Sequence, residues 1–246
     1  FYNFKDPCDI YNEDIDELDN TVIVFLSDNG ADARPPLGIK LEAEYVAKEY
    51  DNKLNNLGKE NSFVSYGGPW ALVGSTPFRS HKGRPSEGGI RVPAIVRFPS
   101  LIKEKTILRE FMSVMDLMPT FLDLAGTSHP GVEYKGRKIW PVEGKSLLPY
   151  LGGEESVVHS KPLYGFSIHK RQGLQVGDWK IIQLSEITKP SWELYNLASD
   201  PGETENLAHK LPERLQAMIS EWEKFTDTGI IVSGPKARAP NECQKI

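Results

Sequence analysis

Hydrophobic and polar positions follow two different patterns in the first half of the chain. Thr21–Leu26 is a continuous apolar run rich in β-branched residues, which is typical of a strand buried on both faces, as in the middle of a parallel sheet. Val92–Phe98 is a second buried strand of this kind. Phe111–Leu124 carries apolar residues at helical spacing, and Asp116 is expected to serve that helix as an N-terminal carboxylate rather than as a metal ligand.

The period of the pattern changes after Gly152-Gly153, where a short helix over Ser146–Leu151 is expected to end. Short strands separated by turn residues are predicted over Pro162–Ile168, Gly173–Val176, Trp179–Leu184 and Trp192–Leu197, and an amphipathic helix over Leu211–Phe225. An antiparallel sheet covered by one helix is an α+β unit. We therefore predict two domains, residues 1–152 and residues 153–246.

A carboxylate and an amide follow the first predicted strand directly. Asp28 and Asn29 precede Gly30, which lets the backbone turn sharply. In open α/β sheets, ligands gather outside the carboxyl ends of the strands, and adjacent hard oxygens suit Ca²⁺ or Mg²⁺ rather than a soft metal. The same sequence is also compatible with a plain turn in which Asp28 and Asn29 cap a following helix.

A loop dense in glycine, proline and cations precedes the second predicted strand. It runs from Pro77 to Pro93, and its glycines allow the backbone to approach a ligand closely. Lys82 is a mobile point charge suited to an anion. A solvated basic loop, with glycines that only serve turns, is the alternative interpretation.

The order of these motifs resembles the sulfatases of the alkaline-phosphatase superfamily. The resemblance rests on Asp28-Asn29-Gly30 after a hydrophobic strand, Arg79 three residues before Lys82, and then Glu87-Gly88-Gly89-Ile90-Arg91-Val92-Pro93. It continues through Val114–Gly126, Gly177–Lys180, Glu193–Asn196 and Asp200–Glu203, and the stretch from Ala31 to Gly74 is most similar to bacterial-type arylsulfatases. The resemblance implies an α/β fold, part of a mixed, mostly parallel sheet flanked by helices, in residues 1–152. A small α+β domain with an antiparallel sheet and a C-terminal helix would follow.

What the resemblance implies is metal-dependent hydrolysis of a sulfate ester to sulfate and an alcohol or phenol. Family enzymes use a formylglycine made in a Cys/Ser-x-Pro-x-Arg motif, together with a divalent cation, for which the oxygen ligands favour Ca²⁺ over Mg²⁺. Asp28 and Asn29 would be metal ligands. Lys82 would contact the sulfate and stabilise the leaving oxygen, and His81 would be a second anion contact or a proton donor.

Several parts of the family's site are not expected in this chain. Cys8 is followed by Asp-Ile-Tyr and Cys243 by Gln-Lys-Ile, so neither can be the modified nucleophile. We expect the Cys/Ser-x-Pro-x-Arg motif, the paired aspartates of the first family strand, its first lysine and two histidines all to be absent. The chain is therefore interpreted as the C-terminal part of a sulfatase, inactive without the N-terminal half of the same protein.

Side chains around Lys82 allow more than one role. Arg79 and Arg91 could bind sulfate, or they could clamp carboxylates such as Glu87 and hold the loop in shape. Tyr66, Trp70 and Phe78 could form an aromatic wall for an aryl group, or they could pack the loop onto the domain.

Composition limits the partners without selecting the function. The 246 residues carry a formal net charge of −5, which gives no nucleic-acid footprint. No run approaches the roughly 18 apolar residues of a membrane span. The expected partner is a small-molecule sulfate ester, with neither nucleic acid nor membrane. The alternatives are a phosphomonoesterase or phosphonate hydrolase of the same superfamily, and a non-catalytic chain that binds sulfated ligands.

Overall fold

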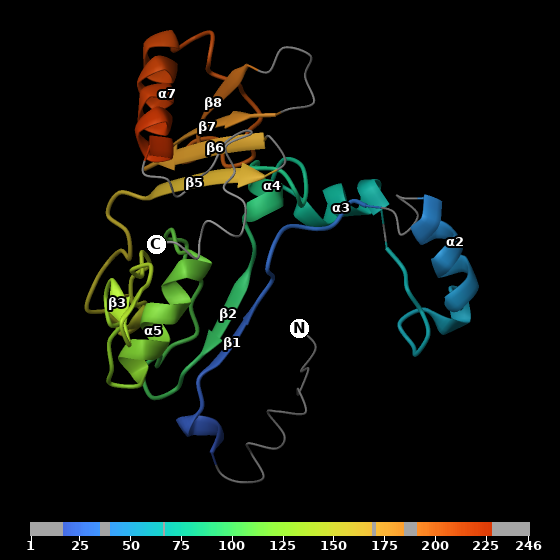
Figure 1. Cartoon of the computed structure of the whole chain (residues 1–246), viewed down its shortest axis with the longest axis horizontal. Coiled ribbons are helices and arrows are strands. Elements are labelled where there is room, and N and C mark those ends of the chain that lie inside the picture. The colour runs from blue at the N-terminus through green and yellow to red at the C-terminus, as the bar shows by residue number, and fades with distance from the viewer. Residues whose placement is uncertain (1–16, 35–39, 66, 169–170, 185–190, 228–246) are drawn as a thin grey trace. The chain divides into compact units, whose positions relative to one another are not determined.

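The computed structural model describes residues 17–34, 40–65, 67–168, 171–184 and 191–227 (Figure 1). These residues form two compact units. The first unit contains the described residues up to Leu26 together with Ala94–Pro162, and the second contains those of Ser27–Pro93 and Leu163–Ala239. Helices mixed with strands, an antiparallel sheet and a C-terminal helix confirm the predicted fold class. All strand pairings among the described residues are antiparallel, so the mostly parallel sheet expected in residues 1–152 is not seen in them. The domain boundary after residue 152 stays a prediction.

The first unit is built on a two-stranded ribbon. Strand β1 (Ile23–Leu26) pairs antiparallel with β2 (Ala94–Arg97), after a short 3₁₀ helix, η1 (Leu18–Asn20). The expectation that the first strand is buried on both faces is wrong for this chain, because its described strand partner is antiparallel and Phe25 is 71% exposed. A continuous apolar run therefore provides one packed face and one open face here.

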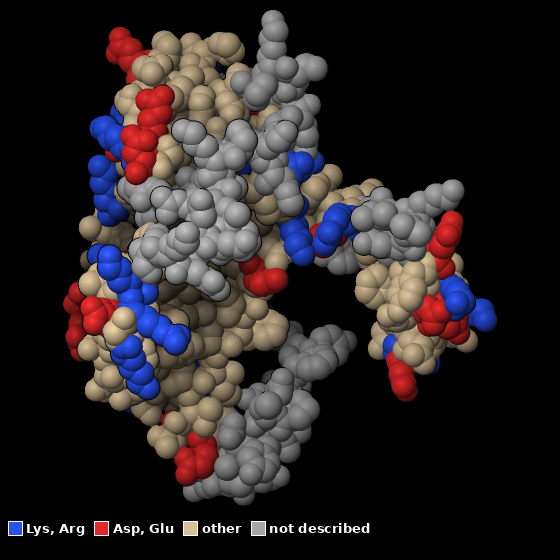
Figure 2. All heavy atoms as spheres, in the orientation of Figure 1, with Lys and Arg blue, Asp and Glu red and all other residues tan. Residues whose placement is uncertain are grey.

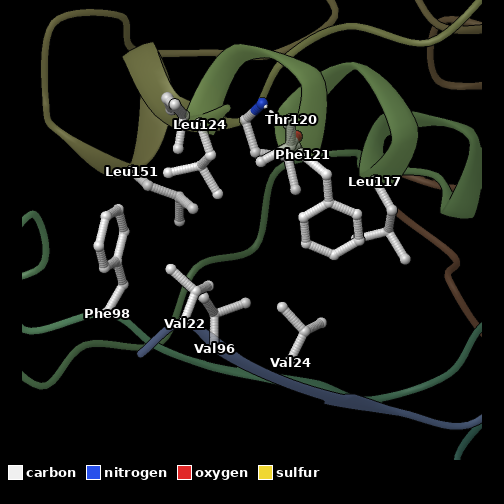
Figure 3. A pocket seen from close by; sticks show the side chains of 11 residues that line it. Val22, Val24, Val96, Phe98, Leu117, Thr120, Phe121, Leu124 and Leu151 are labelled. Carbon is white, nitrogen blue, oxygen red and sulfur yellow. Dashed lines mark hydrogen bonds between the residues drawn. The ribbon is translucent and has the colours of Figure 1, made fainter. Parts of the chain in front are cut away.

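The other face of the ribbon packs against helices of the same unit. Figure 3 shows side chains of β1 and β2 directed toward those of α5 (Leu117–Leu124), across a small apolar hollow. Its lining is made of aliphatic and phenylalanine side chains, with Thr120 as the polar exception: Val22, Val24, Val96, Phe98, Leu117, Phe121, Leu124, Leu147, Leu148 and Leu151 complete it. A lining of this composition marks a packing core rather than an anion site.

Asp116 has the structural role that the sequence predicts. The helix α5 follows a 3₁₀ turn, η3 (Val114–Asp116), in which Ser113 and Asp116 form a capping box. The buried Asp116 carboxylate also accepts hydrogen bonds from the backbone N–H of Lys145 at 2.9 Å and lies 3.0 Å from His159 Nε2. The predicted start at Phe111 is wrong because Ser113 begins the helical turn as its cap.

The remaining elements of the first unit are short. They are the hairpin of β3 (Glu133–Tyr134) and β4 (Arg137–Lys138), and helix α6 (Leu148–Leu151), which is followed by Gly153 at φ +80°. The helix predicted over Ser146–Leu151 is therefore confirmed with a later start.

The second unit contains a four-stranded antiparallel sheet covered by the last helix (Figure 1). Its strands, in sequential order, are β5 (Leu163–Ile168), β6 (Arg171–Val176), β7 (Trp179–Gln183) and β8 (Trp192–Asn196). Helix α7 (Pro212–Asp227) buries Met218 and Trp222 against Leu174, Ile181 and Leu194. All four predicted strands and the helix are confirmed, because period-2 and period-3.6 patterns with clear turn residues define them.

Helices in the long polar stretch were only partly predictable. The sequence predicts one helix, Leu41–Tyr50, in the polar stretch from Ala31 to Gly74, and α2 (Lys40–Glu49) confirms it. A short turn, η2 (Leu54–Asn56), follows. Helix α3 (Gly67–Ser75) was missed, because Gly67, Gly68 and Pro69 at its start are typical of a loop. Helix α4 (Glu87–Ile90) lies in the predicted glycine-rich loop. Among the helices that the structure describes, none has the length and hydropathy needed to cross a bilayer.

Candidate anion and metal site

Two segments far apart in the sequence meet at three glycines in the second unit. The Gly30 N–H donates to the Gly89 carbonyl at 3.0 Å, and a Cβ on Gly30 would lie 1.9 Å from the Gly88 carbonyl oxygen. The backbone N–H of Lys82 donates to the Ala31 carbonyl at 3.0 Å. The residues after β1 and the loop that carries Lys82 therefore form one backbone assembly, in which any side chain at position 30 would force the two apart.

Lys82 faces a carboxylate that the sequence patterns did not single out. Its Nζ lies 3.3 Å from Asp32 Oδ2, and the Arg34 guanidinium lies 3.2 Å from the same oxygen. The Arg34 side-chain and backbone hydrogen bonds lower the pKa of Asp32 to about 2, with a smaller contribution from Lys82. Asp32 is thus an anion at neutral pH. Its position four residues after Asp28 is the only sequence signal that could have indicated it.

Asp28 and Asn29 are available to a ligand. The Asp28 side chain is exposed and makes no hydrogen bond or ion pair with the other residues that the structure describes. The Ser27 hydroxyl donates to the Asn29 carbonyl at 2.8 Å, which fixes the backbone of the turn. A carboxylate and an amide oxygen in adjacent positions suit a hard divalent cation.

Two such donors are fewer than the six to eight oxygens that Ca²⁺ takes, so other groups must complete a metal site. Among the described residues there is no group of three or more His, Cys, Asp or Glu side chains that could hold a metal. The donor pair therefore fits a divalent cation as part of a larger ligand set.

The structure describes His81 and two of the three residues of the predicted aromatic wall. His81 Nδ1 lies 3.0 Å from the Lys82 carbonyl oxygen, so its ring is held against the backbone of the loop. The Phe78 ring lies 4.7 Å from the Arg91 guanidinium carbon, and Trp70 on α3 is 65% exposed. Tyr66 lies outside the described residues. The role of His81 and the aromatic wall stay predictions.

A buried charge cluster holds the start of α4. Lys180 on β7 is fully buried, and its Nζ lies 2.6 Å from Glu87 Oε1 and 2.8 Å from Glu203 Oε1. The Glu203 carboxylate also accepts the backbone N–H of Glu87 at 3.0 Å. Burial raises the pKa of Glu203, although Lys180 opposes that shift. No sequence pattern joins residue 180 to residues 87 and 203, so this cluster could not be predicted.

The two arginines near Lys82 act on carboxylates. Arg91 lies 3.6 Å from Glu87 Oε2, as the clamp interpretation predicts. Arg79 clamps another carboxylate: it lies 2.7 Å from Glu193 Oε2 and also donates to the Tyr195 hydroxyl, so the clamp interpretation holds for both arginines with different partners. Burial and the Glu193 carboxylate raise the pKa of Tyr195, which stays protonated and donates to Glu193 at 2.7 Å.

The expectation that no Ser-x-Pro-x-Arg motif occurs is wrong. Ser75-Thr76-Pro77-Phe78-Arg79 has those letters. Ser75 is buried at the last position of α3, and its hydroxyl lies 3.3 Å from the Gly88 carbonyl. Because Ser75 and Arg79 both make internal contacts, this stretch supports the loop and does not present a nucleophile to solvent.

Net charge does not set the field at this site. Figure 2 shows Lys and Arg side chains interspersed with Asp and Glu on the face in view. Exposed charges separated by more than a Debye length are screened, so charges close to Lys82, such as Asp32 and its partner Arg34, act on an anion there more than the net charge does.

Comparison with known families gives two matches along the chain. Residues 85–224 match the family described as "N-sulphoglucosamine sulphohydrolase, C-terminal", and residues 13–127 match the family described as "Sulfatase". The first match alone covers more than half of the chain.

Curated relatives extend over most of the chain but are much longer. An uncharacterized sulfatase of Schizosaccharomyces pombe is 40% identical over 236 residues, which are 91% of this chain and 41% of that protein. An arylsulfatase of Klebsiella aerogenes is 34% identical over 129 residues, which are 52% of this chain and 27% of that protein. The chain thus spans well under half the length of these relatives.

Solved structures share the fold. The structure of BT4656 in complex with its substrate D-glucosamine-2-N,6-O-disulfate has a TM-score of 0.55 at 21% identity, and covers 89% of this chain and 36% of that one. The crystal structure of Ps i-CgsB in complex with k-i-k-neocarrahexaose has a TM-score of 0.56 at 23% identity, with coverages of 87% and 38%. Identities this low support the common fold alone.

Proposed function

This chain belongs to the sulfatase family, and we propose that the protein containing it hydrolyses sulfate esters to sulfate and an alcohol or phenol. The observation that carries the proposal is the backbone assembly of the Asp28–Ala31 segment with the Lys82 and Gly88-Gly89 loop. It supports a common site for two oxygen donors and one ammonium group, which is what a metal-assisted sulfate site needs.

Lys82 is proposed to bind the sulfate group and to stabilise the leaving oxygen. Negative charge on the sulfuryl and leaving oxygens shifts during S–O cleavage, so a fixed cation beside them lowers the barrier. Lys82 can reach an anion because its side chain is 38% exposed, while its backbone is held by Ala31. His81 is proposed as a second anion contact.

Asp28 and Asn29 are proposed to bind a divalent cation, with Ca²⁺ favoured by the all-oxygen donor pair. When bound, the cation would supply Lewis-acid stabilisation of the sulfate oxygens. The exposed carboxylate of Asp28 supports this role, because an aspartate already engaged in an internal ion pair would have to give up its partner to bind metal. Gly30, the next residue, donates its backbone N–H to Gly89 in the loop that carries Lys82, which supports a shared site.

We propose that the nucleophile and the remaining metal ligands come from a part of the protein outside this chain. Cys8 and Cys243 do not lie in the modification motif, and Ser75 is buried against the Gly88 carbonyl. The purified 246-residue chain is therefore expected to show no aryl-sulfate turnover, which a continuous phenol-release assay would check. Turnover by this chain, or formylglycine at Ser75 by peptide mass spectrometry, would contradict the proposal.

Replacing Asp28 with asparagine in the full-length protein tests the metal role. The amide keeps the size of the side chain and removes its charge, so we expect metal affinity to fall by about 10–100-fold. Calcium titration by isothermal calorimetry after chelation measures this, with turnover recorded at the same calcium concentrations. Excess calcium should restore part of the activity.

Asp51→Asn is a matched control for this substitution. Asp51 lies in the same unit, and its carboxylate accepts the Lys53 backbone N–H at 3.2 Å, far along the chain from the proposed site. It should leave calcium affinity unchanged. Equal affinities in Asp28→Asn and the unmodified protein would remove Asp28 from the metal site.

A further inference from the structure

The carboxylate of Asp32 pairs with two cations, one of which is Lys82 of the proposed sulfate site. Lys82 Nζ lies 3.3 Å from Asp32 Oδ2, and Arg34 lies 3.2 Å from the same oxygen. The other oxygen, Oδ1, accepts the Arg34 backbone N–H at 2.9 Å. Asp32 therefore places one negative charge within 3.3 Å of the Lys82 ammonium group that an anion would meet.

The position of Asp32 is fixed by the backbone around it. Ala31, one residue before it, accepts the Lys82 backbone N–H, and the Arg34 carbonyl accepts the Ser65 hydroxyl at 2.6 Å. Helix α3 packs on the same segment, with Gly74 beside the Ala31 side chain. These contacts hold the main chain of Asp32, and its pairing with Lys82 and Arg34 keeps the carboxylate close to any ligand of Lys82.

We propose that Asp32 is a specificity-determining residue that restricts the Lys82 site to singly charged sulfate esters and disfavours doubly charged phosphate monoesters. This inference rests on the proposed function. A sulfate ester carries one negative charge, whereas a phosphate monoester carries nearly two above its second pKa of about 6. The second charge adds repulsion from Asp32, and specificity is the difference between the two binding free energies.

The solvent exposure of Asp32 and Lys82 limits how strongly the Asp32 charge can change the preference for sulfate. The side chains of Asp32 and Lys82 are 37% and 38% exposed, so solvent screens much of their field. We therefore expect the preference for sulfate over phosphate to change by about tenfold, rather than by several orders of magnitude, when the Asp32 charge is removed.

The test compares two esters of the same phenol, 4-nitrophenyl sulfate and 4-nitrophenyl phosphate, on the full-length protein at about pH 8, where the phosphate is a dianion. Asp32→Asn should lower the ratio of kcat/KM for sulfate to kcat/KM for phosphate about tenfold. Asp32→Glu keeps the charge and should keep the ratio near that of the unmodified protein. Asp19→Asn, which breaks an exposed pair with Arg97 in the first unit, is the matched control.

The outcomes separate this inference from the proposed function. An unchanged ratio in Asp32→Asn would overturn the inference. An equal loss for both esters would also overturn it, because Asp32 would then only hold Lys82 in place. Absence of sulfate turnover by the unmodified protein would count against the proposed function alone, since calorimetric affinities for phenyl sulfate and phenyl phosphate still measure the charge preference. Thermal unfolding of each variant shows whether it is folded.

Discussion

Replacing Lys180 with methionine should lower the free energy of unfolding by about 3–5 kcal/mol, because it leaves two buried carboxylates without their cation. Lys180 is fully buried on β7 and is paired with both Glu87 and Glu203. Methionine has a similar length and no charge, so the loss of packing is small. Urea-induced unfolding at neutral pH, followed by far-UV circular dichroism, measures the change.

The destabilisation caused by Lys180→Met should depend on pH in a definite direction. Burial raises the pKa of Glu203. A carboxyl with a pKa above its unfolded value binds protons more tightly in the folded state, so its contribution to stability falls as pH rises from about 4.5 through the folded pKa. Without Lys180 this penalty grows, and the difference between the variant and the unmodified protein should therefore shrink as the pH is lowered toward 4.5.

Lys210→Met is the control for the Lys180 substitution. Lys210 forms an exposed ion pair with Glu205 in the same unit, and exposed pairs are worth about 0–1 kcal/mol. Lys210→Met should therefore unfold almost like the unmodified protein at every pH. If both substitutions changed the free energy of unfolding equally, the ion pairs of Lys180 would contribute no more than an exposed ion pair does.

Lys82→Ala in the full-length protein should lower kcat/KM for an aryl sulfate by about 10²–10³-fold, the loss typical of removing one preorganised charge from a developing anion. Stability should change little, because the Lys82 side chain is more than a third exposed and its described ion-pair partner is the surface residue Asp32. Initial rates over a range of substrate concentrations give kcat and KM separately.

Two further variants sharpen the Lys82 prediction. Lys82→Arg keeps a positive charge but spreads it over a planar group, so only part of the rate should return. Lys59→Ala removes an exposed lysine of the same unit and should leave kcat/KM unchanged. A rate for Lys82→Ala equal to that of Lys59→Ala would exclude Lys82 from the site.

Local patterns predicted the elements whose residues are close together in sequence. The hairpin of β6 and β7 turns at Gly177, which has φ +58°, and α7 has a continuous apolar face. The open face of β1 was not predictable. A continuous apolar strand has the same sequence pattern whether this chain covers both of its faces or leaves one face exposed, as at Phe25.

The candidate site was predictable only in its parts. Residue types identified Asp28 and Asn29 as oxygen donors and Lys82 as a cation. These predictions need only the side-chain chemistry and the neighbouring turn glycines, which are local in the sequence. The close approach of Gly30 to Gly88, the pairing of Lys82 with Asp32 and the anchoring of Glu87 by Lys180 all depend on long-range packing. Such contacts leave no periodic signal in one sequence.

A double-mutant cycle of Asp28→Ala and Lys82→Ala in the full-length protein tests most directly whether the two residues serve one sulfate group. Groups that act together on the same transition state are strongly non-additive, so the double variant should lose far less kcat/KM than the product of the two single losses. Losses that multiply, with a coupling free energy below about 0.5 kcal/mol, would mean that Asp28 and Lys82 act at independent places and would contradict the single site.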